Sequence, residues 1–192
     1  MATAQDVIDR VRDYYGERIP TQLEDARLLR ALNDALKQLY LDAPEKRLKY
    51  NFTDTGPIGL GTYGSADMPA NILRLVSVRD VDTASPLLQI PAAALEAIDS
   101  SSYMTPRHPV FAVDGRRFFV RPVGLTVEIQ YIPIPAALTG FTATVPIGED
   151  LVPALAALTA GLCFVQEESP EMAAAMFEQY QKLLKVDEVA AQ

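Results

Sequence analysis

The segment from Val110 to Leu184 decides the fold. It reads Val-Phe-Ala-Val-Asp-Gly-Arg-Arg-Phe-Phe-Val-Arg-Pro (110–122), then Val-Glu-Ile-Gln-Tyr-Ile-Pro-Ile-Pro (127–135), Val-Pro-Ile-Gly-Glu-Asp (145–150) and two helical patterns. An Asp-Gly pair between two alternating stretches is the strongest short-range signal for a β-hairpin. We therefore predict paired strands at 110–113 and 117–121. A further strand at 127–132 should end at the prolines, which cannot donate to a sheet ladder.

Two helices are predicted before this segment. Thr3 and Asp6 form a capping-box-like pair at the start of the first, and Gly16 is placed to end it. A second capping-box pair, Thr21 and Glu24, precedes a run of leucines at helical spacing that stops at a proline. We expect both helices to bury one apolar face.

Two more helices are predicted at the C-terminal end. The pattern over 151–166 is apolar nearly all round, so this helix should be buried on most sides. Asp150 is its expected N-cap, and Pro153 falls in its first turn, where a missing N–H costs little. Cys163, the single cysteine, should be a buried and unreactive thiol. A last helix should begin at Ser169-Pro170.

The middle of the chain is β-rich. Strand patterns and one short helical pattern occur between the terminal helices, at 49–53, 72–80, 87–90 (strands) and 92–98 (helix). The glycine-rich stretch 56–64 is predicted to be a loop. The fold class is therefore α+β: a bundle of N- and C-terminal helices, 1–47 and 146–192, with an antiparallel β lobe, 48–145, inserted between them.

Composition limits the classes of function. The chain has 192 residues and a formal net charge of −8. A chain this acidic is a poor general binder of nucleic acid, because neutralising phosphates requires an excess of Lys and Arg. It can surround DNA without gripping it, because acidic walls repel phosphates. The start, Met1–Asp6, lacks the basic and apolar runs of a signal peptide, and 151–165 is too short to span a bilayer, so we expect a soluble protein without membrane partners.

One motif suggests a cofactor. The spacing Gly59-x-Gly61-x-x-Gly64 matches the dinucleotide-binding glycine pattern, and Asp80 follows where that pattern places an acid. The third glycine should open a helix that faces the pyrophosphate, but a strand pattern follows instead. We interpret the motif as a turn between strands and predict no cofactor.

No catalytic or metal-binding residue is predicted. A single histidine, His108, excludes two-histidine zinc motifs and disfavours a catalytic triad, so we interpret it as a surface residue or, alternatively, a partner contact. The acidic pairs at 80/82, 149/150 and 167/168 fit loop solvation, helix N-terminal charge and a solvated helix end.

Arginines gather at the predicted hairpin. Arg116, Arg117 and Arg121 lie on it or beside it. The simplest interpretation is a solvated hairpin, and the functional alternative is contact with DNA or with an acidic neighbouring subunit. Arg116 and Arg117 are therefore candidate interface residues.

Four parts of the chain carry a family resemblance. They are 5–13 with 28–35, 68–76, 111–122 with 127–138, and 145–147 with 155–158 and 176–184. In this order they resemble the head-to-tail adaptor proteins of tailed phages, the small connectors that dock beneath the portal. The likeness rests on packing and turn residues along most of the chain.

The resemblance implies a structural virion protein rather than an enzyme. It implies a ring, usually of twelve copies, at the head–tail neck, assembled in the host cytoplasm, with portal and tail nozzle or tail-tube proteins as partners. Double-stranded DNA would pass through the lumen without sequence recognition. Twelve copies at −8 each give a ring charge of about −96. In such families the C-terminal segment often docks on the portal, which makes Leu184, Val186 and Val189 candidate contacts.

Two alternatives stay open. A tail-terminator or tail-tube component of the same machine has a similar sequence character, although the long terminal helices favour the adaptor. A small acidic hydrolase that uses paired carboxylates belongs to a different class. The lone histidine and the lack of a pocket signature argue against it.

Overall fold

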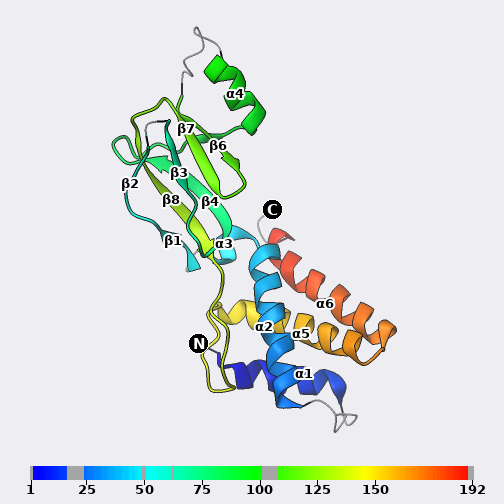
Figure 1. The fold of residues 1–192 in the computed structure, drawn as a ribbon. Coiled ribbons are helices and arrows are strands. Elements are labelled where there is room, and N and C mark those ends of the chain that lie inside the picture. Colours follow the sequence, from blue (N-terminus) through cyan, green and yellow to red (C-terminus); the bar gives the residue numbers. More distant parts are fainter. Residues whose placement is uncertain (1, 17–23, 49–50, 62, 101–107, 190–192) are drawn as a thin grey trace. The chain divides into compact units, whose positions relative to one another are not determined.

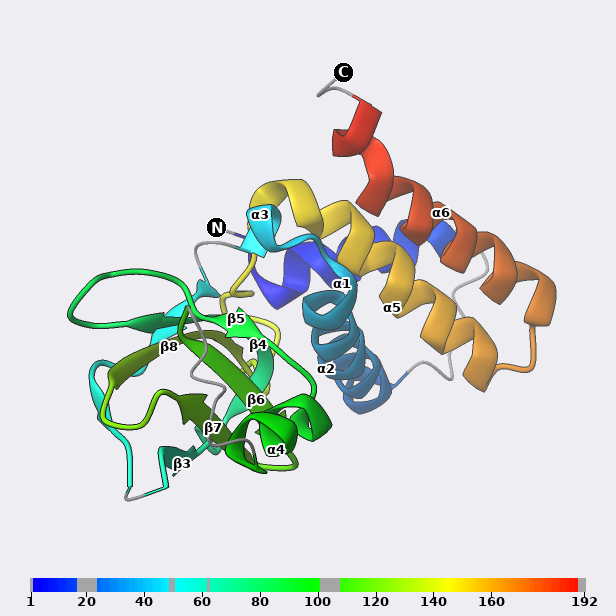
Figure 2. The same ribbon diagram turned by 90° about the horizontal axis from the view of Figure 1, so that it is seen from above.

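The chain forms two compact units (Figures 1 and 2). The computed structural model describes residues 2–16, 24–48, 51–61, 63–100 and 108–189, with the backbone alone for 99–100 and 186–189. The helical unit comprises residues 1–51 and 134–192, and the β unit comprises residues 52–133. The mixed α+β class is confirmed, since the terminal helices pack together and β-sheets are inserted between them in the chain. The predicted boundaries at 47/48 and 145/146 concern independent domains and stay a prediction.

The helical unit is built around one central helix. Its elements are α1 (Ala4–Tyr15), α2 (Asp25–Asp42), α3 (Glu45–Leu48), a 3₁₀ turn η2 (Glu149–Leu151), α5 (Val152–Gln166) and α6 (Pro170–Val189). Figure 2 shows α5 between its neighbours, and it packs against α1, α2 and α6. Most of its side chains are buried, as the all-round apolar pattern predicts.

The length and composition of Glu149–Gln166 would also suit a membrane span. In the structure, 67% of this stretch is buried inside the molecule. Burial against three helices accounts for its apolar surface without a bilayer.

The predicted start and end of α1 are confirmed. The Thr3 backbone N–H donates to Asp6 Oδ2 at 2.7 Å, and the Asp6 N–H donates to Thr3 Oγ1 at 3.3 Å, which completes a capping box. Gly16 ends the helix with a φ of 60°, which glycine adopts without strain. The buried face of α1 comprises Ala4, Val7, Ile8, Val11 and Tyr15.

Two predicted helix caps have a different outcome. Thr21 lies outside the described residues, and α2 begins at Asp25 with Glu24 as an N-cap that makes no side-chain bond. The prediction of Asp150 as the N-cap of α5 is wrong, because Leu151 holds that position. Asp150 lies within the preceding 3₁₀ turn, where its carboxylate pairs with Arg47 instead.

The β unit contains two sheets. In the first, β8 (Thr126–Pro133) pairs antiparallel with β1 (Thr53–Asp54), β2 (Ile58–Gly59) and β4 (Ile72–Asp80). The second has the order β3 (Ser65–Asp67), β7 (Arg117–Arg121), β6 (Val110–Asp114) and β5 (Leu88–Gln89). The β5–β6 pair is parallel, so the lobe is not wholly antiparallel. The helix α4 (Ala92–Ser100) packs on β6.

The predicted hairpin is confirmed and anchors the core of the β unit. Asp114 pairs with Arg117 across the turn, and Gly115 has a φ of 58°. Alternate residues of the hairpin and of β8 point into one apolar cluster, which comprises Val78, Leu87, Phe111, Phe118, Val120, Val127, Ile129 and Tyr131. The predicted loop 56–64 is corrected in part, because residues 58–59 pair with β8 as strand β2.

Candidate functional site

The two candidate arginines differ in how firmly they are held. Arg117 pairs with Asp67 at 3.5 Å, donates to Ser65 Oγ at 3.2 Å and lies over the ring of Phe119. Arg116 is exposed, and its Nη2 donates a 3.5 Å hydrogen bond to the backbone oxygen of Ala70. A bond this long contributes little. Arg116 is therefore the more available cation at the hairpin tip.

The C-terminal candidates fall into two groups. Leu184 is 7% exposed and packs inside the helical unit. Val186 and Val189 lie on the last turns of α6, and their side chains are outside the described residues. Nearby on the same helix, Tyr180 donates to Asp42 Oδ2 at 2.8 Å, and burial is the main cause that raises the pKa of this tyrosine.

Arg47 is a residue that sequence reasoning missed. Its side chain is 8% exposed, and Nε donates to Asp150 Oδ2 at 2.9 Å while Nη2 donates to the Asp150 backbone oxygen at 3.0 Å. Nη1 donates to the backbone oxygen of Leu183 at 3.0 Å. One guanidinium thus fastens the end of α6 to α3 and to the turn before α5. Its partners lie more than a hundred positions away in the chain, so no local pattern could reveal it.

The sequence suggested that Asp80 is an acid in a solvated loop, and this expectation is wrong. It ends β4 and is 3% exposed. Its Oδ2 accepts a hydrogen bond from Thr83 Oγ1 at 2.7 Å, and its Oδ1 accepts one from the Asp82 N–H at 3.2 Å. These hydrogen bonds stabilise the turn that follows β4. Asp82, in contrast, is exposed.

The Asp80 carboxylate forms part of an open pocket in the β unit. We call this the Asp80 pocket, and its lining residues are Asp80, Thr83, Ser85, Pro86, Leu88, His108 and Pro109. His108 is exposed, as predicted, and it meets the pocket from the start of β6. Leu88 is 65% exposed, so an apolar wall beside the acid faces solvent.

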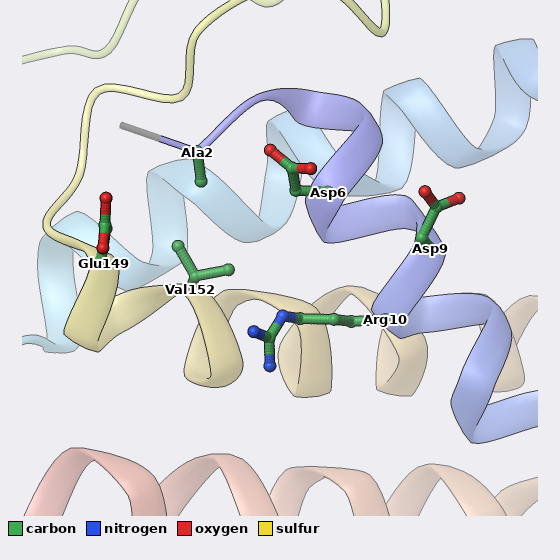
Figure 3. A pocket seen from close by; sticks show the side chains of 6 residues that line it. All are labelled: Ala2, Asp6, Asp9, Arg10, Glu149 and Val152. Carbon is green, nitrogen blue, oxygen red and sulfur yellow. The ribbon is translucent and has the colours of Figure 1, made fainter.

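A second hollow lies in the helical unit, between α1 and the start of α5 (Figure 3). Its lining residues are Ala2, Asp6, Asp9, Arg10, Glu149 and Val152. The backbone N–H of Thr3 holds the pKa of Asp6 below its ordinary value, as expected for a capping residue. Asp9 pairs with Arg12 at 3.3 Å. The two carboxylates that Figure 3 shows on α1 therefore serve a helix cap and an ion pair.

The glycine motif does not form a dinucleotide site. Gly64 has a φ of +63°, and its N–H donates to the Gly61 oxygen at 2.8 Å in a tight turn. A β-carbon at Gly64 would lie 2.7 Å from the backbone oxygen of Val120, so a strand passes where a side chain would be. The motif leads into β3 rather than a helix, which confirms the interpretation as a turn between strands.

The described residues hold neither a cluster of metal ligands nor an exposed thiol. No group of three or more His, Cys, Asp or Glu side chains in that part of the chain is placed to hold a metal ion. Cys163 is fully buried in α5, and burial raises the pKa of its thiol to about 11. The described residues instead serve packing and helix capping, and some of the exposed ones are candidates for contact with a partner protein.

Comparison with known proteins supplies the functional class. A family model described as SU10 adaptor protein matches residues 2–192, which is nearly the whole chain. A search of curated proteins gave no match. The family comprises phage adaptor proteins, whose role is structural and belongs to the virion, and no enzymatic family is indicated. With its bundle of terminal helices and inserted β-sheets, the chain belongs to the SU10 adaptor protein family.

Proposed function

We propose that the protein forms a ring at the neck of the virion, between the portal and the tail. The match of the adaptor family model to residues 2–192 is the observation that carries this proposal. The ring has twelve copies in the proposal, binds the portal on one side and meets tail nozzle or tail-tube proteins on the other. The exposed hairpin tip and the open Asp80 pocket support it as surfaces available for contact between proteins.

The charge of the chain suits a conduit for DNA. Each copy carries −8, so a ring repels the phosphates of double-stranded DNA along its lumen rather than holding them. In this proposal the genome passes through without sequence recognition.

The end of α6 is the proposed portal contact. Arg47 holds the backbone of Leu183, and Leu184 is packed inside the helical unit, so the helix is fixed just before its last turns. The docking contact then falls to residues 186–192, with Val186 and Val189 as its apolar side chains.

Deleting residues 186–192 tests both the portal contact and the function. We expect the truncated protein to keep its fold, because the described core contacts of α6 end at Leu184, and to lose attachment to purified portal in mass photometry and electron micrographs. A full-length variant with Val186 and Val189 both changed to Ala should also lose attachment, because it removes the proposed contacts without shortening the chain. Full attachment of the truncated protein would rule out this docking segment.

The same experiment separates the adaptor from the tail component. Attachment of the full chain to portal, with no preference for tail-tube subunits, supports the adaptor. A full chain that ignores portal and binds tail-tube subunits would overturn the adaptor ring in favour of a tail-terminator role.

A further inference from the structure

The Asp80 pocket contains a buried carboxylate that has no cationic partner among the residues that the structure describes. In the described part of the chain no Lys or Arg side chain pairs with Asp80, although this residue is 97% buried. A buried charge is costly unless it is paired and hydrogen-bonded. A carboxylate offers about four acceptor positions, and the bonds from Thr83 and Asp82 occupy two of them. The remaining two are what a bidentate guanidinium needs.

The walls of the pocket suit the rest of an arginine side chain. Leu88, Pro86 and Pro109 line it beside the acid, and Leu88 is 65% exposed. The aliphatic stem of an arginine can lie along such a surface while its charged head reaches the carboxylate. Arginine also tolerates partial desolvation better than lysine, because its guanidinium is more weakly hydrated.

The hairpin tip offers a matching cation at the opposite end of the same element. Pro109 and the pocket lie at the start of β6, and Arg116 follows the end of β6. Five strand residues separate the two places by about 17 Å, which is too far for Arg116 to reach the Asp80 of its own chain. A surface with the Asp80 pocket at one end and a cation at the other is complementary to a second copy placed head to tail. That arrangement can close into a ring.

We propose that the Asp80 pocket receives the Arg116 side chain of a neighbouring copy. This inference rests on the ring proposed above and names one contact that holds neighbouring copies in it. The neighbour's guanidinium donates to the free lone pairs of Asp80 and compensates its charge, while its stem covers Leu88. Arg117 is less available for this role, because its guanidinium already contacts Asp67, Ser65 and Phe119 of its own chain.

A double-mutant cycle tests the pair. Asp80→Asn, Arg116→Gln and the double variant are compared with the wild type by mass photometry of ring formation on purified portal at graded protein concentrations. We expect each single change to weaken assembly about tenfold, and the double variant to be no weaker than either one, because both changes remove the same contact. Asp82→Asn and Arg117→Gln are matched controls with the same charge changes at neighbouring positions, and they should assemble like the wild type.

The possible outcomes separate the pair from the ring. If the assembly losses of the two single variants simply add in the double variant, the pair is overturned and the proposed function still stands. A wild-type chain that forms no ring on portal would overturn both. If the Asp80 pocket instead contacts an arginine of the portal or tail, Asp80→Asn will weaken ring assembly and Arg116→Gln will not. This outcome also overturns the pair.

A crosslinking experiment covers the case in which Asp80→Asn fails to fold. One batch of protein carries Ser85→Cys at the rim of the pocket, and another carries Arg116→Cys. The two are mixed, assembled on portal and treated with a bismaleimide crosslinker whose span matches the length of an arginine side chain. Cys163 is buried and should not react. Crosslinked dimers on denaturing gels, absent when either batch is assembled alone, are expected. Rings that contain both batches and give no such dimers would contradict the contact.

Discussion

At the scale of single residues, burial controls the thiol of Cys163. Desolvation is the first cause of its raised pKa, about 11 against an ordinary 9.0, and the charge of Glu167 adds to it. The unfolded thiol ionises at lower pH than the folded one, so its contribution to stability is complete below pH 9.0 and is lost as pH rises towards 11.

We therefore expect the unfolding free energy of the protein to fall between pH 9 and 11, and the fall to be smaller for Cys163→Ala. Urea titrations at several pH values measure this. Burial also raises the pKa of Tyr15 and Tyr40, so ionisation of these tyrosines lowers the unfolding free energy in the same range. The effect of Cys163 is therefore taken as the difference between the variant and the wild type. A native thiol that reacts with a thiol reagent at neutral pH as fast as the denatured chain would contradict the burial.

Also at this scale, the sequence could not assign roles that depend on distant partners. Asp80 looked like a solvated acid because it forms an acidic pair with Asp82, yet the turn folds Thr83 onto it and leaves it 3% exposed. Arg47 carried no signal at all, since Asp150 and Leu183 meet it only after the helices pack. By contrast, the single histidine and cysteine were placed correctly, because exposure follows local composition at those two positions.

At the scale of elements, the crossing of α5 and α6 depends on a glycine. A β-carbon at Gly161 would lie 2.7 Å from Cε1 and 2.9 Å from Cδ1 of Phe177. We expect Gly161→Ala to lower the unfolding free energy by about 1–3 kcal/mol, because the ring must move or the helices must separate. Chemical denaturation measures the change.

Two controls sharpen this expectation. Gly140 lies in the same unit with open space where a β-carbon would be, so Gly140→Ala should have a much smaller effect. Phe177→Leu in the Gly161→Ala background should recover part of the loss. Equal effects of the two glycine substitutions would show that close helix packing is not the cause.

Elements with strong periodic patterns were predicted well, and short ones were not. The hairpin, the strand 72–80 and the helix α5 follow from alternation, Asp-Gly and an apolar run. The strand β2 has two residues and depends on pairing with β8, so its glycine-rich sequence reads as a loop. Asp150 has the residue type of an N-cap, but a 3₁₀ turn moved the helix start beyond it.

At the scale of the whole molecule, the β unit is a continuous piece of chain. Its strands β1 and β8 pair near the two ends, with Thr53 opposite Tyr131, so the entry and exit of the unit are neighbours in one sheet. We expect residues 52–133 alone to fold, with dispersed amide signals in NMR spectra and one cooperative thermal transition. A fragment with collapsed amide dispersion would contradict this, and the full chain is the control.

The helical unit, in contrast, is made from both ends of the chain, and α5 joins α1, α2 and α6. During synthesis, α1 and α2 leave the ribosome with their apolar faces uncovered, and the helix that buries those faces is translated some hundred residues later. The β unit is complete before then. The order of translation therefore makes the sheets the first part able to fold, while the apolar faces of the earliest helices stay uncovered until α5 arrives.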